Sequence, residues 1–303
     1  MTGSSPTRFL DPQILRSIAR IELKARLLVE GLYASRHRCP FYGYSVEFVD
    51  HREYAPGDEP RTIDWKMLGR TEKYYVKRFE MESNMNVVCL VDASGSMGYR
   101  PLDATRLNKF DYARYFAASL CYLARKQQDA PGMVLFDEGI REFIPAKQGQ
   151  RHLFTILARL EQAQAARETR LSDAVKQIAQ RLTRRGIIVV ISDCYGEPEA
   201  VLDGLRHLRA RGHEVSTFQL MDRDEVDFPF KALASFRDLE TGRQVVTDPL
   251  RQRAVYLERF AKFNRTLAEG CAAGGIDHRF IDTAMPIEES LRNYLLYRRE
   301  RAR

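Results

Sequence analysis

Side chains able to bind a divalent metal ion follow two apolar stretches of the sequence. Asp92, Ser94 and Ser96 alternate along the chain directly after residues 87–91, and Asp193 follows residues 186–192. Carboxylate and hydroxyl oxygens are hard ligands, which suit Mg²⁺, Ca²⁺ or Mn²⁺. These residues predict a binding site centred on a metal ion rather than an obvious enzyme active site.

Short apolar strands alternate with amphipathic helices from residue 86 onward. Strands are expected at 87–91, 132–136, 141–144, 186–192, 214–220 and 275–281. Helices are expected at 106–127, 150–160, 172–182, 199–210, 250–273 and 287–298. The alternation predicts an α/β fold, a doubly wound and mainly parallel sheet flanked by helices. Because ligands of such sheets bind at the carboxyl ends of the strands, Asp92 and Asp193 are expected to lie close together.

The first 85 residues differ from the rest of the chain. A helix is expected at 11–32, a Gly- and aromatic-rich stretch follows at 36–48, and a strand is expected at 74–82. We expect residues 1–85 to form a helical and aromatic-rich extension that docks on a metal-binding domain of residues 86–303. The acidic stretch 222–230 is interpreted as a connector.

Composition and charge exclude several classes of protein. The five cysteines are scattered and form no Cys-x-x-Cys pair, so neither a zinc site nor a disulfide framework is indicated. No apolar run approaches the roughly 20 residues that span a bilayer, and the start lacks a secretory signal, so a cytoplasmic protein without a membrane span is expected. The net charge of +7 comes without a nucleic-acid-binding motif, and no nucleic-acid partner is expected.

The spacing Asp92-x-Ser94-x-Ser96, with Asp193 after a later strand, resembles the metal-ion-dependent adhesion site of von Willebrand factor A-type domains. In that family a threonine in a loop before a later helix is a further ligand, and Thr169 matches it. Glu168 and Arg170 flank this threonine where the related proteins usually have Gly and often an acid. The resemblance implies that a Mg²⁺, Mn²⁺ or Ca²⁺ ion is bound by Asp92, Ser94, Ser96, Thr169 and Asp193.

A second resemblance lies in the stretch 52–65, which reads Arg-Glu-Tyr-x-Pro-Gly-Asp-x-x-Arg-x-Ile-Asp-Trp. With the continuation at 75–80, it is similar to the signature of the bacterial domain-of-unknown-function family fifty-eight. Members of that family resemble adhesion-type A domains and are often encoded beside MoxR-type AAA+ ATPases. Together with the metal motif, the resemblance covers roughly residues 30–297.

The residues of this signature also have a structural interpretation. Pro56-Gly57 is typical of a turn, which Asp58, Arg61 and Asp64 could fix through ion pairs and hydrogen bonds. Trp65, the one tryptophan of the sequence, is expected to be a buried anchor.

These observations favour a non-enzymatic interaction protein in which an acidic residue of a partner protein completes the metal's ligand shell. The family resemblance implies a MoxR-type AAA+ ATPase as that partner, with this chain as an adaptor in protein maturation or remodelling. The alternative is a metal-dependent phosphoryl hydrolase with Asp92 as nucleophile. Such enzymes need a second acid two residues later, where this chain has Ser94.

Overall fold

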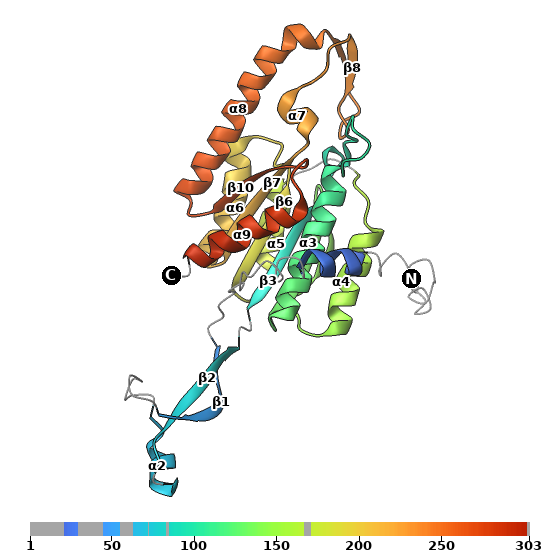
Figure 1. Ribbon diagram of the computed structural model, residues 1–303. Helices are drawn as coiled ribbons and strands as arrows, with labels where there is room; N and C mark the ends of the chain where they lie inside the picture. Colours follow the sequence, from blue (N-terminus) through green and yellow to red (C-terminus); the bar gives the residue numbers. More distant parts are fainter. Residues whose placement is uncertain are drawn as a thin grey trace, which may run out of the picture.

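A six-stranded sheet forms the centre of the molecule. The computed structural model describes residues 21–29, 45–54, 63–71, 73–82, 85–166 and 171–301. The strand order is β10-β7-β6-β3-β4-β5, and neighbouring strands run parallel except for the antiparallel pair β4 and β5 (Figure 1). The strands are β3 (Asn86–Asp92), β4 (Ala130–Phe136), β5 (Ile140–Ile144), β6 (Gly186–Ser192), β7 (Glu214–Met221) and β10 (Asp277–Asp282). This arrangement confirms the predicted fold class, a mainly parallel sheet flanked by helices.

Helices cover both faces of the sheet because its central strands are apolar on both sides. In β3, for example, Cys89 and Val91 pack into one buried cluster, and Val88 and Leu90 pack into the other. One face carries α3 (Lys109–Lys126), α4 (Gln150–Gln162), α9 (Ile287–Arg301) and the helical residues 21–29. The opposite face carries α5 (Leu171–Arg181), α6 (Pro198–Ala210) and α8 (Pro249–Ala273).

The start of β6 needs a glycine to pair closely with β3. A Cβ on Gly186 would lie 2.4 Å from the carbonyl oxygen of Asn86, its partner in the parallel ladder. We expect Gly186→Ala to lower the free energy of unfolding by about 2 kcal/mol, as overpacking does elsewhere. Urea unfolding checks this, with Gly139→Ala as the control because no atom lies within 4 Å of a Cβ there. Equal stability of the two variants would contradict the prediction.

The described N-terminal residues belong to two separate parts. Ile21, Ala25 and Val29 are buried in the main core, so the helical residues 21–29 pack on the domain. In contrast, β1 (Ser45–Glu53) and β2 (Tyr75–Glu82) form their own antiparallel sheet. Figure 1 shows this sheet and α2 (Trp65–Thr71) extending away from the six strands. The division of the chain at residue 85 stays a prediction.

Trp65 is not a buried anchor. Its side chain is 63% exposed, so the expectation of burial is wrong. The residue that the local structure buries is its neighbour Asp64, which is 8% exposed and accepts a hydrogen bond from the backbone N–H of Met67. Asp64 thus caps the first turn of α2, and Trp65, as the first helical residue, faces outward. Asp58 and Arg61, the other members of the predicted network, lie outside the described residues.

The acidic stretch 222–230 is more than a connector. It contains the short helix α7 (Arg223–Asp227), which a capping box between Asp222 and Glu225 fixes. A small hairpin that the sequence did not suggest follows, made of β8 (Ala234–Arg237) and β9 (Gln244–Thr247). Both elements lie at the carboxyl end of the sheet, where ligands of such folds bind.

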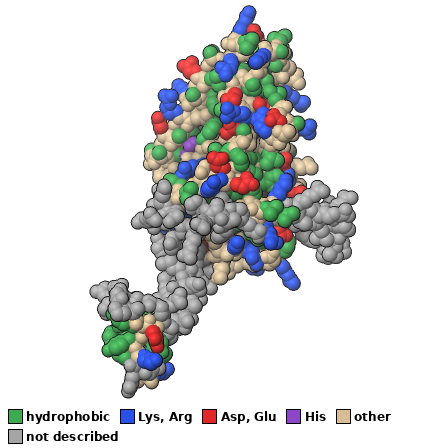
Figure 2. Space-filling view, in the orientation of Figure 1, with side chains coloured by type: hydrophobic (Ala, Val, Ile, Leu, Met, Phe, Trp, Pro, Cys, Tyr) green, Lys and Arg blue, Asp and Glu red, His purple; other side chains and the backbone are tan. Residues whose placement is uncertain are grey.

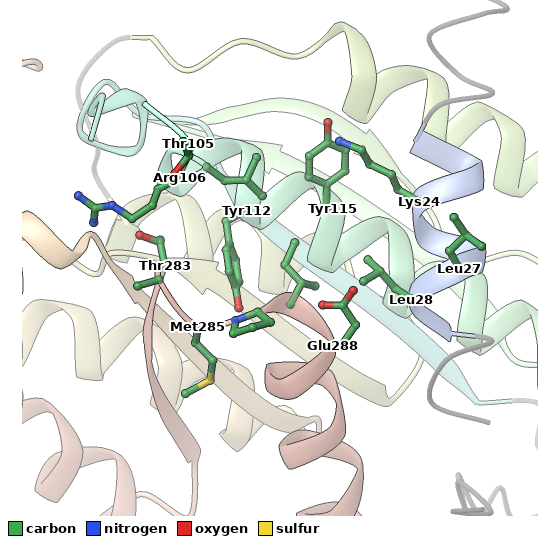
Figure 3. Close-up of a pocket in the computed structure, with 14 residues that line it drawn as sticks. Lys24, Leu27, Leu28, Thr105, Arg106, Tyr112, Tyr115, Thr283, Met285 and Glu288 are labelled. Atoms are coloured by element: carbon green, nitrogen blue, oxygen red, sulfur yellow. The ribbon is translucent and has the colours of Figure 1, made fainter. Parts of the chain in front are cut away.

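A cavity of about 460 Å³ lies between residues 21–29, the start of α3 and the turn after β10. Figure 3 shows side chains from all three segments lining it, and the amine of Lys24 lies 4.0 Å from the centre of the Tyr115 ring. Arg106, on the cavity wall, forms ion pairs with Asp222 and Asp224. The cavity therefore adjoins the acidic residues around α7 without including them.

A chain of polar side chains crosses β10, β7 and α8. A ring nitrogen of His278, Nε2, lies 3.0 Å from Gln219 Oε1, and Gln219 donates to Asn264 at 2.9 Å. Burial and the charge of Arg279 lower the pKa of His278 from 6.5 to about 4. Between these values only the unfolded chain takes up the proton, so the stability that His278 contributes above pH 6.5 is lost as the pH falls toward 4.

We therefore expect His278→Gln to flatten the pH dependence of stability in this range. The full difference corresponds to about 3 kcal/mol. Chemical denaturation of both proteins from pH 7.5 to 4.5 measures the two slopes. Identical slopes would show that His278 titrates normally in the folded protein.

Candidate metal site

Asp92 lies at the end of β3 and is fully buried. Ser192 Oγ donates to one carboxylate oxygen at 2.6 Å, and the backbone N–H of Ser94 donates to the other at 2.9 Å. Ser192 is the last residue of β6, the strand that pairs with β3. The register of these two strands thus brings Asp92 beside Ser192 and Asp193, as expected from their positions after two apolar stretches.

Ser94 and Ser96 present their hydroxyl groups to each other next to Asp92. Their Oγ atoms lie 3.1 Å apart, with Ser94 buried and Ser96 half-buried. Adjacent ligands of an octahedral Mg²⁺ ion are about 3 Å apart when each lies 2.0–2.1 Å from the metal. The two serine oxygens therefore have the spacing that such an ion needs.

Asp193 is also fully buried, and it pairs with a lysine from another element. Lys109, at the start of α3, has a fully buried side chain whose Nζ atom lies 2.9 Å from Asp193 Oδ2 and 2.8 Å from Glu225 Oε1. A cation is unfavourable at the N-terminus of a helix, where the helix dipole is positive. The ion pairs with the two carboxylates must outweigh this effect. The lysine at position 109 is therefore favoured by the site and disfavoured by the helix that carries it.

Burial and neighbouring charges shift the pKa values of three side chains in the cluster, Asp92, Glu225 and Lys109. Burial, and then the charge of Asp193, raise the pKa of Asp92 to about 7. Burial also raises the pKa of Glu225, although Lys109 opposes the change. For Lys109 burial alone would lower the pKa, but Asp193 and Glu225 outweigh it and raise the pKa. When all are ionised, three carboxylates and one ammonium leave a formal charge of −2, which one divalent cation neutralises.

The loop after β6 adds a tyrosine to the cluster. Cys194 has a positive φ of 58°, which turns the chain sharply after Asp193. The hydroxyl of Tyr195 then donates to Glu225 Oε1 at 3.2 Å, and Lys109 Nζ lies 4.9 Å from the centre of the Tyr195 ring. Tyr195 thus covers one side of the ion pair, and its ring centre lies 6.2 Å from that of Phe263 on α8.

The site opens on one side into a cavity of about 430 Å³. Its lining residues are Ser96, Tyr99, Tyr195, Gly196, Glu225, Arg237, Asp238, Leu239 and Glu240. Ser96 and Glu225 connect this cavity with the buried carboxylates, while Arg237 and the residues after it belong to β8 and its turn. A group from outside can therefore approach Ser96 along the hairpin.

A second acidic pair supports the site from α7. Asp222 and Asp224 both bind the guanidinium of Arg106, at 3.2 and 2.7 Å. Asp222 also accepts from Thr283 at 3.1 Å, and Asp224 accepts from the hydroxyl of Tyr99 at 3.2 Å. These contacts hold α7, and with it Glu225, against the residues that precede α3.

The structure thus brings together four of the five residues expected as ligands, Asp92, Ser94, Ser96 and Asp193. The fifth, Thr169, lies outside the described residues. Lys109 and Glu225 were not expected. The spacing Asp222-x-x-Glu225 is a capping-box signal that could have revealed the helix carrying Glu225. No comparable signal marks Lys109.

The donor set fits a hard cation, although Lys109 already engages Asp193. Nowhere in residues 21–29, 45–54, 63–71, 73–82, 85–166 and 171–301 do three or more His, Cys, Asp or Glu side chains cluster as a metal site. A cation bound here therefore depends on the serine hydroxyls as well as on carboxylates, as hard divalent ions accept.

The same described residues contain no helix long and apolar enough to cross a bilayer.

Comparisons with known proteins identify the family. An uncharacterized protein of Mycobacterium tuberculosis (strain ATCC 25618 / H37Rv) is 29% identical over 244 residues, which cover 79% of this chain and 75% of that protein. An aerotolerance-related membrane protein from Bacteroides fragilis NCTC 9343 has a structure with a TM-score of 0.48, at 17% identity, 70% coverage of this chain and 97% of that one. The VWA domain of SpRpn10 gives a TM-score of 0.39, at 8% identity, 69% coverage of this chain and 94% of that one. The family model "Protein of unknown function DUF58" matches residues 50–266, and the chain belongs to this family.

Proposed function

We propose that this protein is a non-enzymatic interaction module that works through a bound divalent metal ion, Mg²⁺ or else Mn²⁺ or Ca²⁺. Asp92, Ser94 and Ser96 would hold the ion, with Asp193 as a further carboxylate, and Thr169 remains a predicted ligand. An acidic residue of a partner protein would complete the ligand shell. The observation that carries the proposal is the convergence of these oxygens from β3 and β6 at an open cavity.

The charge balance of the cluster supports this proposal. Without a metal ion, burial and Asp193 hold the pKa of Asp92 near 7, so the carboxylate lacks sufficient compensation at neutral pH. A divalent cation would supply that compensation and polarise whatever oxygen reaches it. Ser96, half-buried at the cavity, leaves a side of the ion accessible to a carboxylate from outside.

We further propose a MoxR-type AAA+ ATPase as the partner, with this chain acting in the cytoplasm as an adaptor in protein maturation or remodelling. This identification rests on the resemblance of the sequence to its family. Arg237, which lines the cavity, would pair with a carboxylate of such a partner.

A phosphoryl hydrolase has less support. A nucleophilic carboxylate must reach the phosphorus atom of its substrate. Asp92 is fully buried and accepts hydrogen bonds at both oxygens, and Ser94 stands where such an enzyme would have its second acid.

The proposal is tested by capture of a purified MoxR-type ATPase on the immobilised protein, with Mg²⁺ or with EDTA. We expect retention only with Mg²⁺ and at least a tenfold loss for Ser96→Ala. Thr155→Ala, on the exposed side of α4, is the control and should behave as the wild type. Equal retention with EDTA would reject metal-dependent binding. Metal-dependent phosphatase activity that Ser96→Ala abolishes would instead favour the hydrolase.

A further inference from the structure

An exposed apolar surface adjoins the candidate metal site. It consists of the hairpin β8–β9 and the first half of α8, and is called here the hairpin surface. Its exposed large apolar residues are Leu239 (47% exposed), Val245 (61%), Val246 (68%), Leu250 (62%) and Val255 (45%). The hairpin is a two-stranded sheet apart from the six-stranded one, so these side chains contribute little to the core. Apolar groups gathered in this way are typical of an interaction site.

Two cavities meet under this surface. The cavity at Ser96 has been described above, and a second one, of about 420 Å³, lies beside it. Tyr195 and Gly196 line both cavities, so a single short loop separates them. The second cavity is lined by Tyr195, Gly196, Phe228, Phe236, Thr247, Gln252, Val255, Tyr256, Arg259, Phe260 and Phe263. It is called here the aromatic cavity.

The walls of the aromatic cavity are preformed. Phe228 stacks on Tyr256 with ring centres 4.5 Å apart and on Phe236 with ring centres 5.7 Å apart. The hydroxyl of Tyr256 donates to the backbone carbonyl of Glu225 at 2.8 Å, which fixes the ring against α7. These rings are already ordered. An apolar side chain that enters the cavity therefore costs its own conformational entropy but little additional conformational entropy of the protein.

The charge of this region selects the kind of partner. Residues 229–268 carry eight Lys and Arg against four Asp and Glu. Figure 2 shows Lys, Arg, Asp and Glu side chains interspersed with hydrophobic ones at the end of the molecule that β8 and α8 form. Arg237 and Arg259, one in each cavity, form no ion pair with any residue that the structure describes. A carboxylate would pair with either arginine, and a bound cation would offset Glu225, Asp238 and Glu240, which line the same cavity as Arg237.

We propose that the hairpin surface binds a partner segment in which an Asp or Glu lies next to a large apolar residue. The carboxylate enters the cavity at Ser96 and Arg237, and the apolar side chain enters the aromatic cavity on the other side of Tyr195. The inference rests on the proposed function, and adds to it a second pocket that selects the neighbour of the acidic residue.

The test uses acetylated tetrapeptide amides with Asp next to Phe, in both orders, as probes. Matched peptides replace Phe by Ser or Asp by Asn. Binding to the full chain is followed by NMR of its Val and Leu methyl groups with Mg²⁺, and Mn²⁺ binding is measured separately by electron paramagnetic resonance. We expect the Asp–Phe peptides to bind at least tenfold more tightly than either matched peptide and to shift the methyl signals of Val246 and Val255.

Two variants separate the pockets. Gln252→Trp fills the aromatic cavity from an exposed helix position, and Arg237→Glu reverses the charge at the other cavity. Each should weaken the Asp–Phe peptide at least tenfold, and Gln252→Trp should not affect the Asp–Ser peptide. The controls are Lys262→Trp on α8 and Arg243→Glu on the hairpin, which line neither cavity, and both should stay within twofold of the wild type.

The outcomes distinguish this inference from the proposed function. If Mn²⁺ binds but the Asp–Phe and Asp–Ser peptides bind equally, or neither binds, the second pocket is rejected and the metal site stands. If no Mn²⁺ binds and the Asp–Phe peptide still prefers the wild type over Gln252→Trp, the metal function fails and the hairpin surface is retained.

Discussion

Asp92→Asn is expected to abolish divalent metal binding and, at the same time, to make the metal-free protein more stable at neutral pH. The folded-state pKa of Asp92 is raised from 3.8 to about 7. The folded protein therefore holds a proton that the unfolded chain has lost between these values, and stability falls as the pH rises through this window. The full penalty above pH 7 is about 4 kcal/mol.

An asparagine carries no charge, so the variant escapes this penalty. It must still rearrange the hydrogen bond with Ser192, so we expect a net gain of about 2 kcal/mol in EDTA at pH 8. Urea unfolding at pH 8 and at pH 4 measures the gain, which should disappear at the lower pH. Glu258→Gln, at an exposed position on α8, is the control. A variant that is less stable than the wild type at pH 8, or that still binds Mn²⁺, would contradict the assignment.

Lys109→Met is expected to have the largest destabilising effect. It leaves the buried Asp193 and the half-buried Glu225 without the ammonium that lies within 3 Å of both. Breaking a buried ion pair in this way costs about 3–5 kcal/mol. The same change raises the negative charge of the cluster, so a divalent cation should stabilise the variant more than it stabilises the wild type.

Thermal unfolding with EDTA and with Mg²⁺ measures both effects. Lys147→Met, an exposed position, is the control. If Lys109→Met fails to fold in EDTA, the double variant Lys109→Met/Glu225→Gln should recover part of the stability. It removes one of the two carboxylates that are left without a positive partner. An Mg²⁺ response no larger than that of the wild type would show that Lys109 does not share the charge of the metal site.

The sequence predicts the strands that carry this site, because these strands are recognised from local apolar patterns. The apolar stretches that became β3 and β6 are buried on both faces, and such stretches are typical of parallel strands. The acidic residues that follow them had to reach the same edge of the sheet. The apolar pattern and the general rules for α/β folds therefore place Asp92, at the end of β3, and Asp193, just after β6, at the same edge of the sheet.

The remaining parts depend on contacts between distant segments. Lys109 lies 84 residues before Asp193, and nothing around it in the sequence indicates a buried charge. The hairpin β8–β9 has four-residue strands whose pattern is too short to stand out. Trp65 was expected to be buried because large aromatic residues usually are, but a helix cap by its neighbour faces it outward. Burial in such cases is decided by tertiary structure.

Because Trp65 lies on α2 with its side chain exposed, the tryptophan fluorescence of the protein comes from this N-terminal part alone. Trp65 is the one tryptophan of the chain, and it lies on α2, which extends away from the six-stranded sheet. The aromatic side chains that line the cavity at the candidate site are Tyr99 and Tyr195, and no tryptophan lines either cavity. Emission excited selectively from the indole therefore reports on the N-terminal part around α2, so a ligand titration can follow this part without a label.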